Sequence, residues 1–267
     1  RCRSWRRTVR RRDRAPRLRR AAGALALALA LAVPGWFLWQ AYPPAVMMAD
    51  LRAGTGEWKT EVLPDGTRIT LNSGSAVNLR YDARRRALEL LRGEILVDVS
   101  KDASRPFLVE TPDGSMRAVG TRFVVSKTPD GTLLSVLEST VAVRTAQQRA
   151  AGGPDAAQVH AGQALRIHPD RVEAMTEIDA SRVASAWAQH RLFADDRPLA
   201  EVLDILGRHR SGLLQYDAAA IAQVRVSAVL PLDDTERALQ LIAANLPGLR
   251  IRHFTPYLVR VDLLPAP

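Results

Sequence analysis

Cysteine is almost absent from this chain of 267 residues, which contains only Cys2. Neither a disulfide framework nor a zinc cluster with cysteine ligands can form within one copy. The sequence also lacks a phosphate-binding loop, a Gly-x-Ser-x-Gly elbow and a His-Glu-x-x-His motif. The histidines are few and lie far apart, without the spacing of metal ligands: His160, His168, His190, His209 and His253. We therefore predict no metal, no cofactor and no turnover of an external substrate.

Acidic residues are nearly missing from residues 1–20, which hold eleven arginines and one aspartate, Asp13. The rest of the chain contains 27 basic and 27 acidic residues, so the net charge of +10 belongs to this arm. Strongly basic proteins often bind nucleic acid, but here the body of the protein is neutral. We therefore predict that the arm sets membrane topology and attracts anionic lipid, and that no nucleic acid binds.

An uncharged run of 19 residues, 21–39, follows the arm. As a helix it would be about 28 Å long, close to the thickness of the hydrocarbon layer. Trp36, Trp39 and Tyr42 follow at its far end, where aromatic rings favour the headgroup boundary. We predict a transmembrane helix over residues 21–42, with residues 1–20 in the cytoplasm and residues 43–267 exported. The alternative is a signal peptide cleaved near Ala49, which would also export the body.

Hydrophobic residues alternate with polar ones between Trp58 and Arg144, a pattern typical of strands. Three Pro-Asp-Gly triplets, at residues 64–66, 112–114 and 129–131, indicate tight turns between them. We predict an all-β domain of many short strands over residues 55–168, built as a sandwich or a coiled sheet.

Residues 169–190 are predicted to be a connector, within which residues 179–190 form a short helix or a plain linker, and Trp187 is the expected buried anchor. Apolar residues spaced by three and four predict helices over residues 198–208 and from Asp234 onward. The acid pairs Asp195-Asp196 and Asp233-Asp234 precede these helices, so we interpret them as caps and not as catalytic carboxylates. Residues 191–264 are predicted to form a small α+β module with the order βαββαβ.

Five motifs in the β region resemble, in order and spacing, those of the exported domain of the FecR family. They are LPDGTRITLNSGS (63–75), LRGEILVDV (91–99), RPFLVET (105–111), VGTRFVV (119–125) and HAGQAL (160–165). The resemblance implies structural roles for the characteristic residues of the motifs: Pro64, Asp65, Gly66, Gly93, Glu94, Pro106, Phe107 and Gly162. The C-terminal module resembles the secretin-and-TonB N-terminal (STN) module, through residues 193–203 and 225–230.

Two features depart from the family pattern. Ser139-Thr140 stands where the family commonly has a glycine before a strand. The family also usually begins with a cytoplasmic sigma-binding domain of several tens of residues, and we expect the arm of residues 1–20 to be its truncated remnant.

The resemblance implies a single-pass regulator in the bacterial inner membrane, with its C-terminal domains in the periplasm. Family members relay a signal from a TonB-dependent outer-membrane transducer, commonly for iron-chelate uptake, to an extracytoplasmic-function sigma factor. The expected partners are therefore the transducer's N-terminal signalling module and the sigma factor. The alternative is a membrane-anchored periplasmic scaffold of an envelope or secretion complex.

Two sites follow from this interpretation. An open sheet edge in the STN-like module would let a partner add a strand. Its candidate residues are Leu249, Ile251, Tyr257 and Val259, and the alternative is that these strands are internal to the sheet. In some relatives the peptide bond between the Gly and Thr of the VGTRF motif cleaves itself, so Gly120 and Thr121 are a candidate self-cleavage site. The alternative is a glycine at a bulge followed by an ordinary strand residue.

Overall fold

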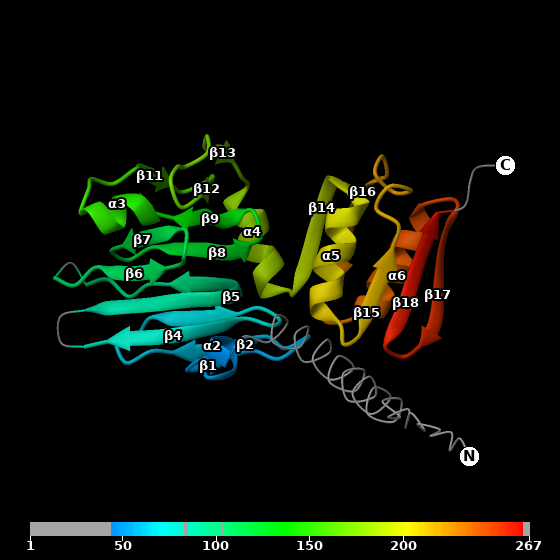
Figure 1. Ribbon diagram of the computed structural model, residues 1–267, viewed down its shortest axis with the longest axis horizontal. Coiled ribbons are helices and arrows are strands. Elements are labelled where there is room, and N and C mark those ends of the chain that lie inside the picture. The colour runs from blue at the N-terminus through cyan, green and yellow to red at the C-terminus, as the bar shows by residue number, and fades with distance from the viewer. Residues whose placement is uncertain (1–43, 83–84, 103, 264–267) are drawn as a thin grey trace, which may run out of the picture. The chain divides into compact units, whose positions relative to one another are not determined.

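The computed structural model describes residues 44–82, 85–102 and 104–263, which fold mostly into β-strands (Figure 1). The chain divides into two units, residues 1–48 and 49–267. Of the first unit, the structure describes a short helix, α2 (Pro44–Met47). The predicted arm and transmembrane helix, residues 1–20 and 21–42, lie outside the described residues. Within the described part of the chain, no helix has the length and apolarity needed to cross a membrane.

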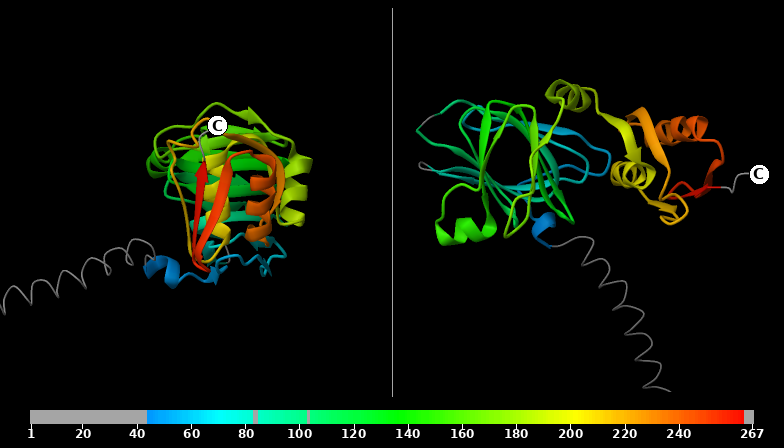
Figure 2. Two further views of the ribbon diagram at one scale, coloured as in Figure 1. Left: turned by 90° about the vertical axis from the view of Figure 1, so that its right-hand side faces the viewer. Right: turned by 90° about the horizontal axis from the view of Figure 1, so that it is seen from above.

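The β domain consists of two sheets that face each other across one hydrophobic core (Figure 2). The first sheet contains β1 (Leu51–Arg52), β4 (Ala76–Tyr81), the first half of β5 (Arg86–Asp98), β6 (Phe107–Glu110), β7 (Gly114–Ala118), β10 (Thr140–Thr145) and β11 (Ala157–His160). The second contains β2 (Lys59–Val62), β3 (Arg68–Leu71), the second half of β5, β8 (Arg122–Thr128), β9 (Gly131–Glu138), β12 (Gln163–Ile167) and β13 (Thr176–Glu177). The prediction of an all-β domain is confirmed.

The long strand β5 joins the two sheets. Its first half pairs with β4 and β6, and its second half pairs with β3 and β8. Gly93 lies where the strand passes from one sheet to the other, with a φ of +88°. A Cβ atom there would lie 2.6 Å from the Cα of Ser75, so both the backbone conformation and the close approach require glycine.

Each of the three Pro-Asp-Gly triplets forms a tight turn between antiparallel strands, as predicted. They connect β2 to β3, β6 to β7, and β8 to β9. Between the turns, alternate side chains point into the core, where Phe107 and Phe123 are fully buried. A further helix, α3 (Ala146–Ala151), follows β10 and is capped by Thr145.

The connector contains a helix, α4 (Ala180–Ala188), capped by Asp179. It packs on the face of the second sheet that points away from the main core. Trp187 is buried there against Leu96, Val124 and Leu137, which confirms its predicted role as an anchor.

The C-terminal module has the order βαββαββ, in which the last two strands contain the residues of the predicted docking edge. Its elements are β14 (Arg191–Pro198), α5 (Leu199–His209), β15 (Leu213–Tyr216), β16 (Arg225–Pro231), α6 (Thr235–Asn245), β17 (Leu249–Thr255) and β18 (Leu258–Leu263). β14 pairs with β16, and β18 lies between β15 and β17. The apolar stripes of α5 and α6 face a second core.

One predicted helix cap is confirmed and the other is wrong. The side chain of Asp234 accepts a hydrogen bond from the Arg237 amide at the start of α6. Asp196, by contrast, does not cap α5, whose N-cap is Pro198. β14 continues to pair with β16 as far as Pro198, so Asp196 lies in a bulge of the sheet, where its carboxylate pairs with Arg225 at 2.9 Å.

Candidate functional site

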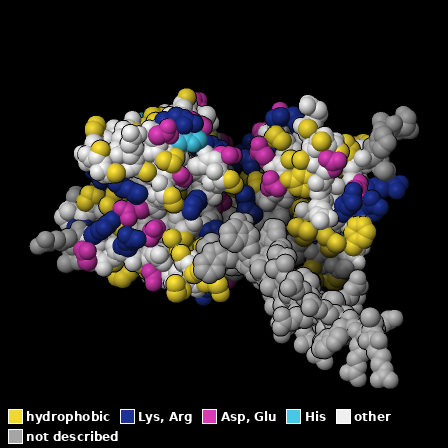
Figure 3. Space-filling view, viewed as in Figure 1, with side chains coloured by type: hydrophobic (Ala, Val, Ile, Leu, Met, Phe, Trp, Pro, Cys, Tyr) yellow, Lys and Arg dark blue, Asp and Glu magenta, His cyan; other side chains and the backbone are white. Residues whose placement is uncertain are grey.

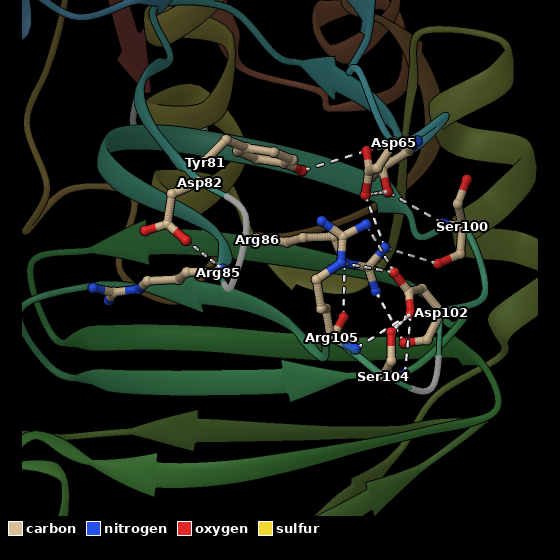
Figure 4. A network of polar contacts seen from close by, with 10 residues as sticks. Asp65, Tyr81, Asp82, Arg85, Arg86, Ser100, Asp102, Ser104 and Arg105 are labelled. Atoms are coloured by element: carbon tan, nitrogen blue, oxygen red, sulfur yellow. Dashed lines mark hydrogen bonds and ion pairs between the residues drawn. The ribbon is translucent and has the colours of Figure 1, made fainter.

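The first FecR-like motif, residues 63–75, contributes Asp65 to a buried polar network centred on Arg86 (Figure 4). The Arg86 side chain is 1% exposed, and its Nη1 lies 2.8 Å from Oδ2 of Asp65. The same guanidinium donates to three backbone carbonyls of the loop between β5 and β6, those of Arg105, Ser100 and Asp102. The ion pair therefore attaches the turn between β2 and β3 to that loop.

The charges of this network are balanced within it. Burial raises the pKa of Asp65, but hydrogen bonds from Thr67 and the neighbouring Arg86 outweigh burial, and the net pKa lies below its ordinary value. Burial, together with the Asp65 charge, raises the pKa of Tyr81 far above its ordinary value. Both groups keep one protonation state near neutral pH, which suits a structural role. Sequence reasoning missed Arg86 because it ends a run of polar residues, 84–86, that resembles an exposed turn.

A second set of polar contacts joins the β domain to the C-terminal module. Asn72 of the first FecR-like motif donates to Oε2 of Glu94 at 2.8 Å, and its Oδ1 lies 2.7 Å from Nε2 of His209, the last residue of α5. Nδ1 of His209 lies 2.9 Å from the Ile205 carbonyl. Close by, the Ser73 hydroxyl donates to a backbone carbonyl at the end of α5.

Burial shifts both titratable groups of this junction toward their neutral forms. It lowers the pKa of His209 below its ordinary value, and the charge of Arg208 adds to that effect. It raises the pKa of Glu94, although the Asn72 amide and two arginine charges oppose the shift. Aromatic rings flank the polar contacts: Trp58 stacks on His190 and meets Trp187 edge to face.

The remaining motif residues lie at turns or in the core. Pro64 and Gly66 form the turn before β3, and Pro106 directly precedes the buried Phe107. Gly162 has a φ of +82° in the turn between β11 and β12. No group of three or more His, Cys, Asp or Glu side chains that could hold a metal occurs among the described residues.

The candidate self-cleavage site lies at the start of β8. Gly120 has a φ of +89°, in the left-handed region, and Thr121 is 4% exposed. The Thr121 Oγ1 is buried and has no hydrogen-bond partner among the residues that the structure describes. The Thr121 carbonyl, in contrast, accepts from the Val99 amide at 2.9 Å. The site thus combines a glycine at positive φ with a buried hydroxyl that has no hydrogen-bond partner among the described residues.

The residues of the predicted docking edge are divided between an edge strand, a central strand and the turn that connects them. Leu249 and Ile251 lie in β17, which pairs only with β18 among the described strands and is therefore an edge strand. Val259 is buried in β18, the central strand, so a partner strand cannot pair with it, and the prediction of β18 as an edge is wrong. Tyr257 lies in the turn between these strands and is 67% exposed. The order of strands depends on pairing between distant segments, which periodicity does not reveal.

Comparison with known protein families gives a match that lies in the β domain. Residues 49–142 match the family model described as FecR protein. This range contains four of the five motifs, and the predicted resemblance to the FecR family is thus confirmed for these residues. A comparison with curated protein sequences found no match.

Solved structures share the fold over a longer range. Two crystal structures of a candidate anti-sigma factor from Parabacteroides distasonis, at 2.50 Å and 1.65 Å resolution, resemble the chain with TM-scores of 0.65 and 0.66. In both the sequence identity is 22%, and the match covers 81% of this chain and 98% or 99% of theirs. Because the β domain makes up less than half of the chain, the shared fold extends into the C-terminal module.

Proposed function

We propose that this protein regulates an extracytoplasmic-function sigma factor and relays to it a signal from a TonB-dependent outer-membrane transducer. The observation that carries the proposal is the FecR match over residues 49–142. The shared fold with a candidate anti-sigma factor supports it. Iron-chelate uptake is the process that the family resemblance suggests for this relay.

In the proposed relay the C-terminal module, which resembles an STN module, receives the signal in the periplasm. The basic arm and the apolar run of residues 21–42 would anchor the chain in the inner membrane, with the arm in the cytoplasm. A reporter enzyme that is active only outside the cytoplasm, fused after Pro267, tests this topology. Activity of the fusion supports the exported topology, and an inactive, cytoplasmic fusion contradicts both this topology and the relay.

The direct test of the input step is a pull-down with the full chain in detergent. The N-terminal modules of the organism's TonB-dependent receptors serve as prey, and a C-terminal module disrupted by Leu203→Asp serves as control. Binding of one receptor module to the wild type alone supports the relay. If no receptor module binds, while components of an envelope or secretion complex do, the protein is a scaffold instead.

We propose, as a second activity, self-cleavage between Gly120 and Thr121. The left-handed Gly120 and the unpartnered Thr121 hydroxyl support it. The Thr121 oxygen would attack the Gly120 carbonyl carbon, the C–N bond between the two residues would break, and the amine of Thr121 would take up the hydroxyl proton. Water would then hydrolyse the ester, which leaves a carboxylate on Gly120 and restores the Thr121 hydroxyl.

A denaturing gel of the purified protein tests the cleavage. We expect two fragments from the wild type and from Thr121→Ser, which keeps the nucleophile, and one intact chain from Thr121→Ala. An intact wild type after prolonged incubation would rule out self-cleavage and leave Gly120 with a purely structural role.

A further inference from the structure

The outer face of the three-stranded sheet β15-β18-β17 is basic, although the module that contains it is neutral. Residues 191–263 hold nine arginines and nine acidic residues. Seven of the acids lie on or next to β14, α5 and α6, and Asp217 follows β15. The outer face of the sheet carries three arginines, Arg250, Arg252 and Arg260, and one acid, Asp262.

Asp262 holds two of these arginines in place without covering them. Its carboxylate accepts from Nε of Arg252 and from Nε of Arg260, each at 2.8 Å. The arginine side chains remain 58% and 51% exposed, whereas that of Asp262 is 18% exposed. Hydrogen bonds from Arg252 and Arg260 hold the pKa of Asp262 below its ordinary value, so the carboxylate stays charged. Both arginine side chains therefore remain accessible to a partner.

Arg250 adds a third cation, and it has no ion-pair partner among the residues that the structure describes. It lies opposite Asp262 in the register of the two strands, and Arg252 lies opposite Arg260. Arg250 and Arg252 are two residues apart on one strand, a spacing of roughly 7 Å. Carboxylates on alternate residues of an extended peptide have the same spacing, and arginine binds carboxylates through paired N–H groups.

Exposed apolar side chains lie at one end of the three-stranded sheet. Phe254 lies in the bulge of β17 between His253 and Thr255 and is 58% exposed, and Leu213 of the edge strand β15, which lies opposite Leu258, is 53% exposed. In the space-filling view, Lys and Arg side chains gather at the end of the molecule where Figure 1 shows β17 and β18, and hydrophobic ones lie beside them (Figure 3).

We propose that this face binds an extended, acidic segment of a partner protein, with carboxylates on alternate residues and an apolar residue at one end. The proposal rests on the proposed function, in which the C-terminal module receives a partner, and it specifies the chemistry of that partner. An acidic partner matches the charge of the face, the exposed apolar end favours a protein segment over a lipid headgroup, and the edge strand β17 allows backbone pairing in addition.

The test measures binding of a labelled synthetic peptide, Leu-Thr-Glu-Thr-Glu-Thr-Leu, to the full chain in detergent by fluorescence anisotropy. Its pattern is the same in both directions, so the orientation of the bound segment does not matter. We expect the triple variant Arg250→Gln, Arg252→Gln, Arg260→Gln to bind about tenfold more weakly or worse. The matched control is Arg191→Gln, Arg225→Gln, Arg237→Gln, which removes the same charge from other surfaces of the module and should bind as the wild type does.

Two further measurements test the apolar and the electrostatic contributions to peptide binding separately. Phe254→Ser leaves the charges intact and should also weaken binding. The affinity of the wild type for the peptide should fall as the salt concentration rises. This measurement does not depend on the folding of any variant. Equal binding of both triple variants, or equal binding of a peptide with Lys in place of Glu, would overturn the proposal. So would binding to phosphatidylglycerol vesicles without binding to the peptide, because the face would then contact membranes.

Failure of the proposed relay and failure of the proposed binding surface give different results. If the relay is wrong, sigma-factor output is absent but the peptide still binds. If only the surface is wrong, the triple variant of the sheet face keeps both its receptor binding and its sigma-factor output.

Discussion

Arg86 shows how one buried side chain can organise a β domain. Its guanidinium pairs with Asp65 and also donates to three backbone carbonyls, so nearly all of its hydrogen-bonding capacity is used inside the protein. A buried ion pair is weak evidence for stability by itself, but removal of one partner leaves an uncompensated charge.

We therefore expect Arg86→Met to lower the free energy of unfolding by about 3–5 kcal/mol. The matched control is Arg80→Met, which removes an ion pair with Glu89 that is largely exposed and should cost at most about 1 kcal/mol. Chemical denaturation monitored by circular dichroism measures both. Similar losses in the two variants would contradict the structural role of Arg86, and Asp65→Asn added to Arg86→Met should recover part of the loss.

Whereas Arg86→Met is expected to lower the free energy of unfolding, removal of the Thr121 hydroxyl is expected to raise it. A buried hydroxyl without a partner costs about 1–3 kcal/mol, and valine has nearly the same shape without that polar group. We expect Thr121→Val to raise the free energy of unfolding by about 1 kcal/mol. Denaturation of Thr121→Val beside uncleaved wild-type protein, whose integrity is checked on a denaturing gel, measures the difference. A loss of stability in Thr121→Val would mean that the hydroxyl has a partner in solution.

At the scale of elements, the passage of β5 between the two sheets depends on Gly93. Gly93 combines a positive φ with a close approach to the backbone of Ser75. Gly74 has a φ of +67°, but a methyl group added at its Cα would meet no other atom within 4 Å. The two glycines therefore separate backbone strain from steric conflict.

We expect Gly74→Ala to cost about 1–2 kcal/mol, which is the backbone strain alone. Gly93→Ala should cost at least about 1–3 kcal/mol more, because the strands must also move apart. Thermal or chemical denaturation of the two variants gives the comparison. Equal costs would show that β5 can shift away from β4 without penalty.

For the whole molecule, the junction of the two modules makes stability depend on pH. The pKa of His209 is lowered by burial from its ordinary value of 6.5. Between that lowered pKa and 6.5 the unfolded chain binds more protons than the folded one, so this histidine reduces stability as the pH falls below 6.5. Glu94 acts in the opposite direction: its pKa is raised, so the folded form holds the proton more tightly and gains stability as the pH falls toward 4.5.

Variants isolate the two contributions. His209→Gln should lose less stability than the wild type when the pH is lowered from about 7.5 to about 4.5, because the titrating group is absent. Glu94→Gln should lose more, since the opposing contribution is gone. Denaturation curves at the two pH values measure both differences. An identical pH dependence in all three proteins would show that the junction opens in solution and leaves both groups in water.

Features set by neighbouring residues followed from the sequence alone. The strands, the Pro-Asp-Gly turns, the apolar stripes of the two long helices and the Asp234 cap depend on local backbone preferences and on periodicity, and the FecR motifs indicated the family of the β domain. Only the tertiary structure decided how β5 is shared by two sheets, that β18 is central, that Asp196 lies in a bulge, and that Arg86 and His209 are buried. Each of these depends on contacts between segments far apart in the chain, whose energies no local pattern contains.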